Sequence, residues 1–271
     1  MKVAGAKILV TGATGGLGQA LARALHERGA ELILTGRRLE LLGPLAEELG
    51  ARMVVADLAL RPDVSRLADE AGDADILVAN AALPATGRLL DLKPAQIDTM
   101  LEVDLRAPIA LTRSLAPAMV ARRRGHIVLI SSLSGKVAAT SSSMYTAAKF
   151  GLRGFAHSVR ADLRGTGVGV SVIMPGFIRD AGMFADAGVK LPPGVGTSSP
   201  QQVTAAVITA IERNRGEVTV APLGMRLGAS LGAVAPGVAA VAQRFMGGDR
   251  VARGLTERQI AKRPDARDPS V

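Results

Sequence analysis

The chain carries the stretch Thr11-Gly12-Ala13-Thr14-Gly15-Gly16-Leu17-Gly18 between an apolar run at residues 7–11 and a stretch with helical spacing at residues 17–28. Glycines allow a sharp turn and a close approach of the backbone to a bound group, and a helix that begins there offers free N–H groups to an anion. A turn of this kind also connects a strand to a helix without binding anything. Its place in the first strand–helix unit nevertheless predicts a site for a phosphate-bearing cofactor.

Six further apolar runs, rich in β-branched residues, follow the first. They lie at residues 31–35, 52–56, 75–79, 126–131, 168–174 and 217–220. Stretches with helical spacing lie between them, at residues 39–49, 94–124, 144–165 and 201–213. This alternation predicts an α/β fold of the Rossmann type, with a doubly wound, seven-stranded parallel sheet and helices on both faces. Gly29, Gly50 and Gly125 are expected to end the first three helices.

We expect one dinucleotide-binding and catalytic domain at residues 1–221, followed by a C-terminal helical extension and tail at residues 222–271. The segment 223–246 is rich in Ala, Gly, Val and Leu. Two arginines and a proline interrupt it, namely Arg226, Pro236 and Arg244. No uncharged run there reaches the length of a bilayer span, so the segment predicts an apolar cap, an oligomer surface or an interfacial helix. The charged stretch 258–271 is expected to fray.

Composition narrows the class of protein. The 271 residues are 48% hydrophobic and contain no Cys, which predicts a sizeable core, no metal centre and a reducing, cytoplasmic location. Residues 1–10 lack the long apolar segment of a secretory signal. A net charge of +9 suits nucleic acid, an anionic membrane or an anionic cofactor. With one Tyr and no Trp to stack on bases, we expect no specific nucleic-acid partner.

The end of the second predicted strand bears on which cofactor is bound. It reads Thr35-Gly36-Arg37-Arg38 and offers no carboxylate to a ribose 2′-hydroxyl. Arg37 and Arg38 suit a 2′-phosphate instead, because a guanidinium pairs with phosphate in a bidentate manner. The alternative is that both simply begin a solvated helix, although cations oppose the helix dipole at that end. We therefore expect NADP in preference to NAD.

A tyrosine and a lysine share one face of the helix predicted at residues 144–165. Tyr145 is the only tyrosine in the chain, and Lys149 follows it by four residues. We expect the ammonium group to lower the pKa of the phenol, as a general acid for a carbonyl or a base for an alcohol requires. Taken alone, the pair also fits an amphipathic helix with a half-buried Tyr and a surface Lys.

The fifth predicted strand ends in Ile130-Ser131-Ser132-Leu133-Ser134-Gly135. The carboxyl ends of strands in such a sheet meet the ligand, so a serine here can hydrogen-bond a substrate oxygen. Ser132 is favoured because it stands thirteen residues before Tyr145 and three before Gly135. Ser131 and Ser134 stay open.

Together these motifs resemble the short-chain dehydrogenase/reductase family over about residues 7–213, with the family's glycine motif at Thr11, Gly12, Gly16 and Gly18. The resemblance implies hydride transfer between NADP(H) and a carbonyl or alcohol substrate. It gives Tyr145 the proton transfer, Ser132 the substrate oxygen and Lys149 the nicotinamide ribose. It also implies a homodimer or homotetramer built through the helices at residues 94–124 and 144–165.

The resemblance further implies a set of cofactor contacts. Asp57 matches the family's adenine-contacting Asp, and Asn80-Ala81-Ala82 resembles its Asn-Ala-Gly turn, with Ala82 in place of Gly. The expected cofactor-binding residues are Gly12, Thr14, Gly15, Gly16, Leu17, Gly18, Arg37, Arg38, Asp57, Leu58, Asn80, Ala81, Ala82, Tyr145, Lys149, Pro175, Gly176 and Ile178.

Two positions depart from the family pattern. Asp104 stands where members usually have an Asn that holds a water of the proton relay, and a carboxylate cannot donate as an amide does. We still count it as a candidate catalytic residue. Phe177-Ile178 stands where a Thr often contacts the nicotinamide amide, which leaves the backbone of Ile178 for that contact. These departures keep a second function open. In this alternative the protein is a catalytically idle NADP-binding sensor or scaffold, which either associates with a membrane surface or does not.

The segment after the sixth predicted strand is expected to be a long loop that covers the substrate. It carries the apolar residues Phe177, Ile178, Met183, Phe184, Val189 and Leu191. They predict a lid over a hydrophobic ketone or alcohol, with ordinary loop packing as the alternative. Arg179 is expected either to catch a substrate carboxylate or to pair with Asp180 or Asp186.

Overall fold

The computed structural model describes residues 1–84, 87–189, 191 and 195–237. Its centre is a seven-stranded parallel sheet in the order β3-β2-β1-β4-β5-β6-β7. The strands are β1 (Lys7–Thr11), β2 (Glu31–Gly36), β3 (Arg52–Val55), β4 (Ile76–Ala79), β5 (Gly125–Ile130), β6 (Val168–Pro175) and β7 (Glu217–Val220). The chain winds outward from β1 in both directions, so the crevice for a ligand opens at the carboxyl ends of β1 and β4.

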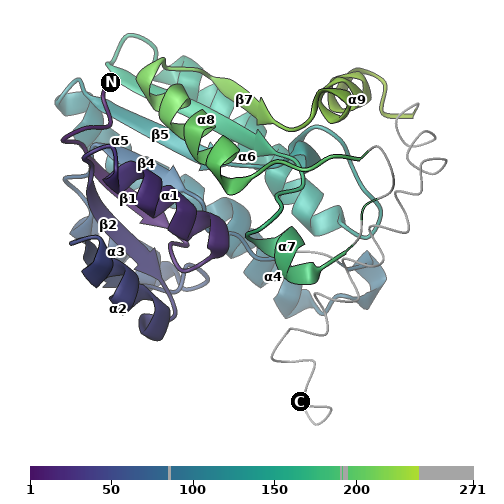
Figure 1. The fold of residues 1–271 in the computed structure, drawn as a ribbon, viewed down its shortest axis with the longest axis horizontal. Coiled ribbons are helices and arrows are strands. Elements are labelled where there is room, and N and C mark those ends of the chain that lie inside the picture. Colours follow the sequence, from purple (N-terminus) through teal and green to yellow (C-terminus); the bar gives the residue numbers. More distant parts are fainter. Residues whose placement is uncertain (85–86, 190, 192–194, 238–271) are drawn as a thin grey trace.

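Helices cover both faces of the sheet (Figure 1). They are α1 (Gly16–His26), α2 (Leu39–Glu48), α3 (Arg61–Glu70), η1 (Leu89–Asp91), α4 (Pro94–Leu101), η2 (Glu102–Arg106), α5 (Ala107–Ala121), η3 (Leu133–Gly135), α6 (Ser143–Asp162), α7 (Met183–Ala187), α8 (Pro200–Glu212) and α9 (Leu223–Val234). One buried apolar cluster joins the sheet to α1, α2 and α8. A second joins the other face to α3, α5 and α6. The predicted Rossmann-type fold class is confirmed.

The helix predicted at residues 94–124 is interrupted. A π-helical turn, η2, separates α4 from α5. Gly125 does not end this helix: Arg123 takes the left-handed conformation at φ 50°, and Gly125 opens β5. A Cβ on Gly125 would lie 2.6 Å from Cβ of Met119, so this glycine serves close packing of helix on strand. Gly29 and Gly50 follow α1 and α2 with positive φ, as expected.

Two helices lie where no helix was expected. Helix α3 follows β3, and charged residues dominate its exposed side while only Val64, Leu67 and Ala68 are buried. Such a short, mostly polar segment gives a weak periodicity signal. Helix α7 lies within the segment expected to be a loop, and Gly182 precedes it with φ 83°.

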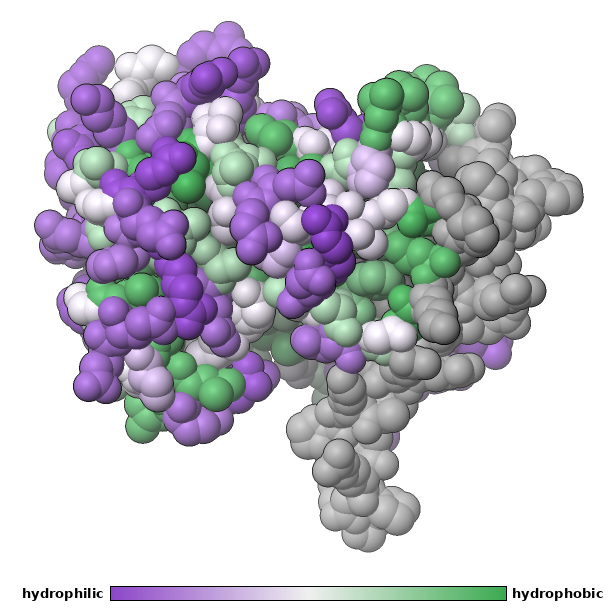
Figure 2. Space-filling view, in the orientation of Figure 1, coloured by the Kyte–Doolittle hydropathy of each residue, from purple (hydrophilic) through white to green (hydrophobic). Residues whose placement is uncertain are grey.

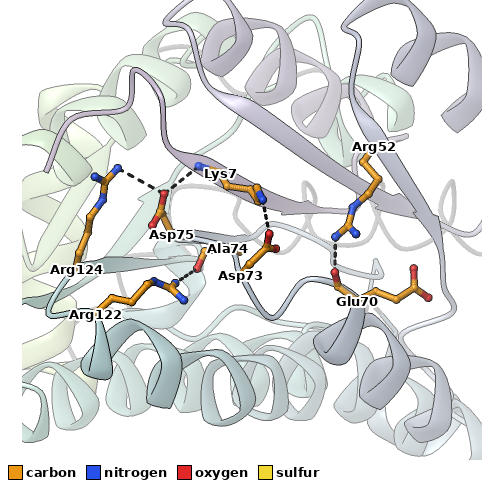
Figure 3. A network of polar contacts seen from close by, with 8 residues as sticks. All are labelled: Lys7, Arg52, Glu70, Asp73, Ala74, Asp75, Arg122 and Arg124. Carbon is orange, nitrogen blue, oxygen red and sulfur yellow. Dashed lines mark hydrogen bonds and ion pairs between the residues drawn. The ribbon is translucent and has the colours of Figure 1, made fainter.

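The amino ends of the strands are tied together by charged side chains (Figure 3). The carboxylate of Asp75 accepts a hydrogen bond from the backbone N–H of Lys7 at 3.2 Å and lies 3.5 Å from the guanidinium of Arg124. Arg122 donates to the carbonyl of Ala74 at 2.9 Å. Because most of these side chains are partly exposed, the network adds little stability. It occupies the sheet edge opposite the carboxyl ends of the strands, where the predicted site lies.

Helix α9 is the described part of the predicted C-terminal extension, and the division at residue 221 stays a prediction. Residues 238–246 of the segment predicted at 223–246, and the tail at 258–271, lie outside the described residues. Among the described helices, none is long and apolar enough to cross a bilayer.

Candidate active site

The turn between β1 and α1 is built from close backbone contacts. Gly12 has φ +65°, and a Cβ on it would lie 2.7 Å from Cα of Ala81. A Cβ on Gly18 would lie 2.1 Å from the carbonyl oxygen of Gly12. Gly15 precedes the helix without a side-chain cap, so the first N–H groups of α1 stay open to an anion. The turn therefore has the shape and polarity of a phosphate site.

Polar bonds across the switch point hold this turn in place. The hydroxyl of Thr11 accepts hydrogen bonds from the backbone N–H groups of Asn80 and Ala81, both at 3.0 Å. The Asn80 amide donates to the carbonyls of Thr11 at 3.0 Å and Gly12 at 3.3 Å. Asn80 thus supports the glycine turn, a positioning role that the sequence motif alone does not specify.

The end of β2 is followed by two guanidinium groups, and Gly36 packs closely on Thr14. A Cβ on Gly36 would lie 2.9 Å from Cγ2 of Thr14, so a longer side chain there requires Thr14 to move. Arg38 donates to the carbonyl of Thr14 at 3.3 Å. Arg37, 56% exposed, lies 3.6 Å from the carboxylate of Asp57. Both cations therefore lie beside the glycine turn.

The three predicted catalytic side chains meet at the carboxyl end of β5. The amine of Lys149 is buried, lies 5.4 Å from the ring centroid of Tyr145 and donates to the carbonyl of Ile130 at 3.2 Å. The hydroxyl of Ser132 lies near the Tyr145 phenol and lowers its pKa. The hydroxyl of Ser132 also accepts from the backbone N–H of Ser134 at 3.1 Å. The tyrosine, lysine and serine therefore form one group on α6 and η3.

The neighbouring serines have other contacts. The buried hydroxyl of Ser131 donates to the carbonyl of Lys149 at 3.0 Å. A Cβ on Gly135 would meet that carbonyl oxygen at 2.8 Å, so a glycine is needed for α6 to approach this closely. Ser131 thus joins strand to helix, and Ser132 is the serine that acts on the phenol.

Asp104 lies buried in the π-helical turn η2, 1% exposed. One carboxylate oxygen accepts a hydrogen bond from the backbone N–H of Leu83 at 2.6 Å. The other has no hydrogen-bond partner among the described residues. Burial raises the pKa of Asp104 to about 6, against the opposing effects of the Lys149 charge and the Leu83 bond. No sequence pattern indicated the contact with Leu83.

The pKa of Tyr145 corrects a prediction from the sequence. Burial and then the charge of Asp104 raise it to about 12, while the hydrogen bond with Ser132 lowers it. The expected lowering by Lys149 is not seen: its amine donates to the carbonyl of Ile130, and it is not among the groups that shift the pKa of Tyr145. Burial lowers the pKa of Lys149, and Asp104 opposes that effect. Three buried ionisable groups are thus coupled, with the phenol held in its protonated form.

The family model for short chain dehydrogenases matches residues 6–190. The chain belongs to the short-chain dehydrogenase/reductase family. It is 33% identical over 258 residues to dehydrogenase/reductase SDR family member 7B of Bos taurus, covering 87% of this chain and 79% of that protein. Ketoacyl reductase HetN of Nostoc is 34% identical over 225 residues, covering 80% and 78%.

A solved structure of a metagenomic short-chain oxidoreductase in complex with NADP is also similar. It is 33% identical, superposes with a TM-score of 0.69, and the match covers 81% of this chain and 98% of the other. The oxidoreductase family and the Rossmann-type fold expected from the sequence are therefore confirmed.

In this short-chain dehydrogenase, the segment after β6 covers the glycine turn. A Cβ on Gly16 would lie 2.8 Å from the backbone nitrogen of Gly182. The bridge between Ile178 and Ser198 uses the carbonyl of Phe177 and the N–H of Arg179. In parallel pairing, the N–H and C=O of Ile178 itself then face the other side. Its backbone is therefore free for the contact that the family resemblance implies.

The apolar residues of this segment pack on one another. The rings of Phe177 and Phe184 lie 4.9 Å apart between centroids. Arg179 pairs with Asp180 at 3.3 Å and donates to the carbonyl of Thr197 at 3.3 Å. A contact of Arg179 with a substrate carboxylate stays a prediction. Within the described part of the chain, no group of acidic and histidine side chains is arranged to hold a metal ion.

Replacing Asp104 with Asn tests the coupling in this short-chain dehydrogenase. The amide oxygen can still accept from Leu83, but the charge that raises the pKa of Tyr145 is gone. We expect the pH profile of alcohol oxidation, which needs the phenolate, to shift to lower pH. The wild-type ionisation near pH 6 should also disappear from the profile of carbonyl reduction. A profile that stays in place, or moves to higher pH, would contradict this account of Asp104.

Proposed function

We propose that this chain is an NADP(H)-dependent oxidoreductase that interconverts carbonyl and alcohol groups, with Tyr145 as general acid and base. The observation that carries the proposal is the phenol near Ser132 and beside the buried amine of Lys149, at the carboxyl edge of the sheet. An idle sensor does not require that arrangement. A set of carbonyl compounds tested with NADPH decides between them, because a sensor binds NADPH without oxidising it.

The residues present fit the cofactor. The backbone cradle from Gly12 to Gly18 would hold the pyrophosphate, because any Cβ at Gly12 or Gly18 would close it. Arg37 and Arg38 would take the 2′-phosphate, Lys149 the nicotinamide ribose and the Ile178 backbone the amide. Asp57 would contact the adenine, and the other predicted contacts are at Leu58, the turn of residues 80–82, Tyr145, Pro175 and Gly176. When bound, NADPH supplies a hydride to the carbonyl carbon.

The side chains of the protein handle the oxygen and the proton. Ser132 donates a hydrogen bond to the substrate oxygen and orients it. Tyr145 gives its hydroxyl proton to that oxygen as negative charge develops there, and takes it back in the oxidation direction. Asp104 would accept a hydrogen bond from a water at its unpartnered oxygen, in place of the family's Asn.

Arg37 tests the choice of NADP over NAD. Replacing it with Ala removes a charge-assisted bond to the 2′-phosphate, which contributes about 1.5–3 kcal/mol. We expect the KM for NADPH to rise about tenfold or more, with the KM for NADH nearly unchanged. Steady-state kinetics with both cofactors measure this, and Arg28→Ala, at an exposed arginine beyond α1, is the control. Equal losses with the two cofactors would refute the assignment.

The lid segment supports an apolar substrate. Phe177 and Phe184 pack together beside the glycine turn and remain partly exposed. We expect hydrophobic ketones to be reduced with higher kcat/KM than small polar ones. A preference for the polar compounds would end this part of the proposal.

We also propose a cytoplasmic homodimer or homotetramer. Phe150, on α6, is 41% exposed and suits a helix-to-helix contact between two copies. Sedimentation of the wild type and of Phe150→Glu measures the assembly, and a monomeric wild type would refute it.

A further inference from the structure

Helix α9 (Leu223–Val234) carries large apolar side chains on its solvent side. Leu223, Leu227, Leu231 and Val234 follow at intervals of four, four and three residues, so they share one helix face. Their exposed fractions are 68%, 57%, 71% and 87%. Figure 2 shows a hydrophobic cluster where α9 lies in Figure 1. We call these four residues the α9 leucine face, and a patch of this kind marks a binding surface.

The opposite side of α9 contacts the chain just after β6. Ala229 and Gly232 are buried on this side of the helix. The Met225 methyl group lies 3.3 Å from the place of a Cβ on Gly176, as does a methyl group of Leu133, the residue after Ser132. The α9 leucine face is therefore on the side of the helix that is turned away from Gly176 and Leu133.

The charge of the chain indicates what covers this face. The protein has a net charge of +9, and residues 222–271 contain eight Lys and Arg against four Asp and Glu. A second copy would bring the same positive charge, whereas an anionic phospholipid surface offers both hydrocarbon and negative charge. The 12 residues of α9 span about 18 Å, less than the roughly 30 Å of a bilayer core. The geometry suits a helix that lies in the membrane interface.

We propose that α9 docks this enzyme on anionic membrane surfaces, with the α9 leucine face in the interface. Docking places the carboxyl edge of the sheet near the lipid, so an apolar carbonyl compound dissolved there has a short path to Ser132 and Tyr145. The path rests on the proposed function, whereas the docking itself does not.

Vesicle flotation of the full-length protein tests the docking. Phosphatidylcholine vesicles containing phosphatidylglycerol should carry the wild type, and pure phosphatidylcholine vesicles should carry much less. Leu227→Gln with Leu231→Gln keeps helix propensity and removes two apolar side chains, so we expect partitioning to fall about tenfold or more. Leu39→Gln with Leu41→Gln is the matched control on α2, beside the far strand β3, with exposed fractions of 53% and 40%. NADPH binding by each variant checks that it is folded.

Three results would overturn the proposal. The first is a wild type that does not float with anionic vesicles. The second is a Leu227 and Leu231 variant that floats as well as the wild type, which would mean that the basic residues bind the vesicles without the leucines. The third is a protein that self-associates through these leucines in sedimentation and does not bind vesicles. None of these readouts uses hydride transfer, so a failure here is distinct from a failure of the proposed reaction.

Discussion

Tyr145→Phe is expected to lower kcat by about 10²–10⁴-fold while NADPH still binds. The phenylalanine keeps the ring beside Lys149 and removes only the hydroxyl that would give up the proton. With a pKa of about 12 the hydroxyl is protonated at neutral pH, so the proton that it would give up during carbonyl reduction is present. Single-turnover oxidation of NADPH, with cofactor affinity measured by fluorescence titration, gives both quantities.

A control separates loss of the proton donor from loss of the local structure. Ser131→Ala removes the buried bond to the carbonyl of Lys149 and should lower the stability more than the rate of proton transfer. If Tyr145→Phe reduces carbonyl compounds as fast as the wild type, another group donates the proton and the assignment of Tyr145 is wrong.

Gly18→Ala is expected to disrupt the cofactor cradle. Its Cβ would lie 2.1 Å from the carbonyl oxygen of Gly12 and 2.9 Å from Cα of Ala13, and backbone atoms cannot move aside as a flexible side chain does. We expect a loss of about 1–3 kcal/mol in the free energy of unfolding from the overpacked turn. NADPH affinity should fall more than tenfold, because the first N–H groups of α1 are displaced.

Gly15→Ala is the matched substitution in the same turn. The nearest atom to its Cβ is the carbonyl oxygen of Gly12 at 3.5 Å, an ordinary contact, and Gly15 has no positive φ. Thermal unfolding should therefore place Gly15→Ala near the wild type and Gly18→Ala well below it. Equal stability of the two variants would contradict the described packing of the turn.

The fold was predictable because its strands are buried on both faces. All residues of β4, β5 and β6 are buried, and the sequence of such a strand is a nearly continuous apolar run. Helix α3 was not predicted, because its charged residues outnumber its three buried residues and its apolar periodicity is therefore weak. The end of α5 was misplaced because Arg123 takes the left-handed conformation, in which a glycine is the usual residue.

The sequence predicted which residues form the candidate site better than it predicted their pKa values. Spacing brought Ser132, Tyr145 and Lys149 together, since four residues along a helix share a face. The pKa of Tyr145 depends on burial and on Asp104, which lies on η2, about forty residues earlier in the chain. The π-helical turn that carries Asp104 and its bond to Leu83 has no sequence pattern of its own. Such effects arise from packing between distant segments.

The most direct test of the central claim is the oxidation of NADPH by the wild-type protein with a set of apolar and polar carbonyl compounds. We predict that NADPH is consumed in step with the carbonyl and that the alcohol appears in equal amount. Tight binding of NADPH without oxidation by any compound of the set would contradict the account and leave a nucleotide-binding protein of the same fold.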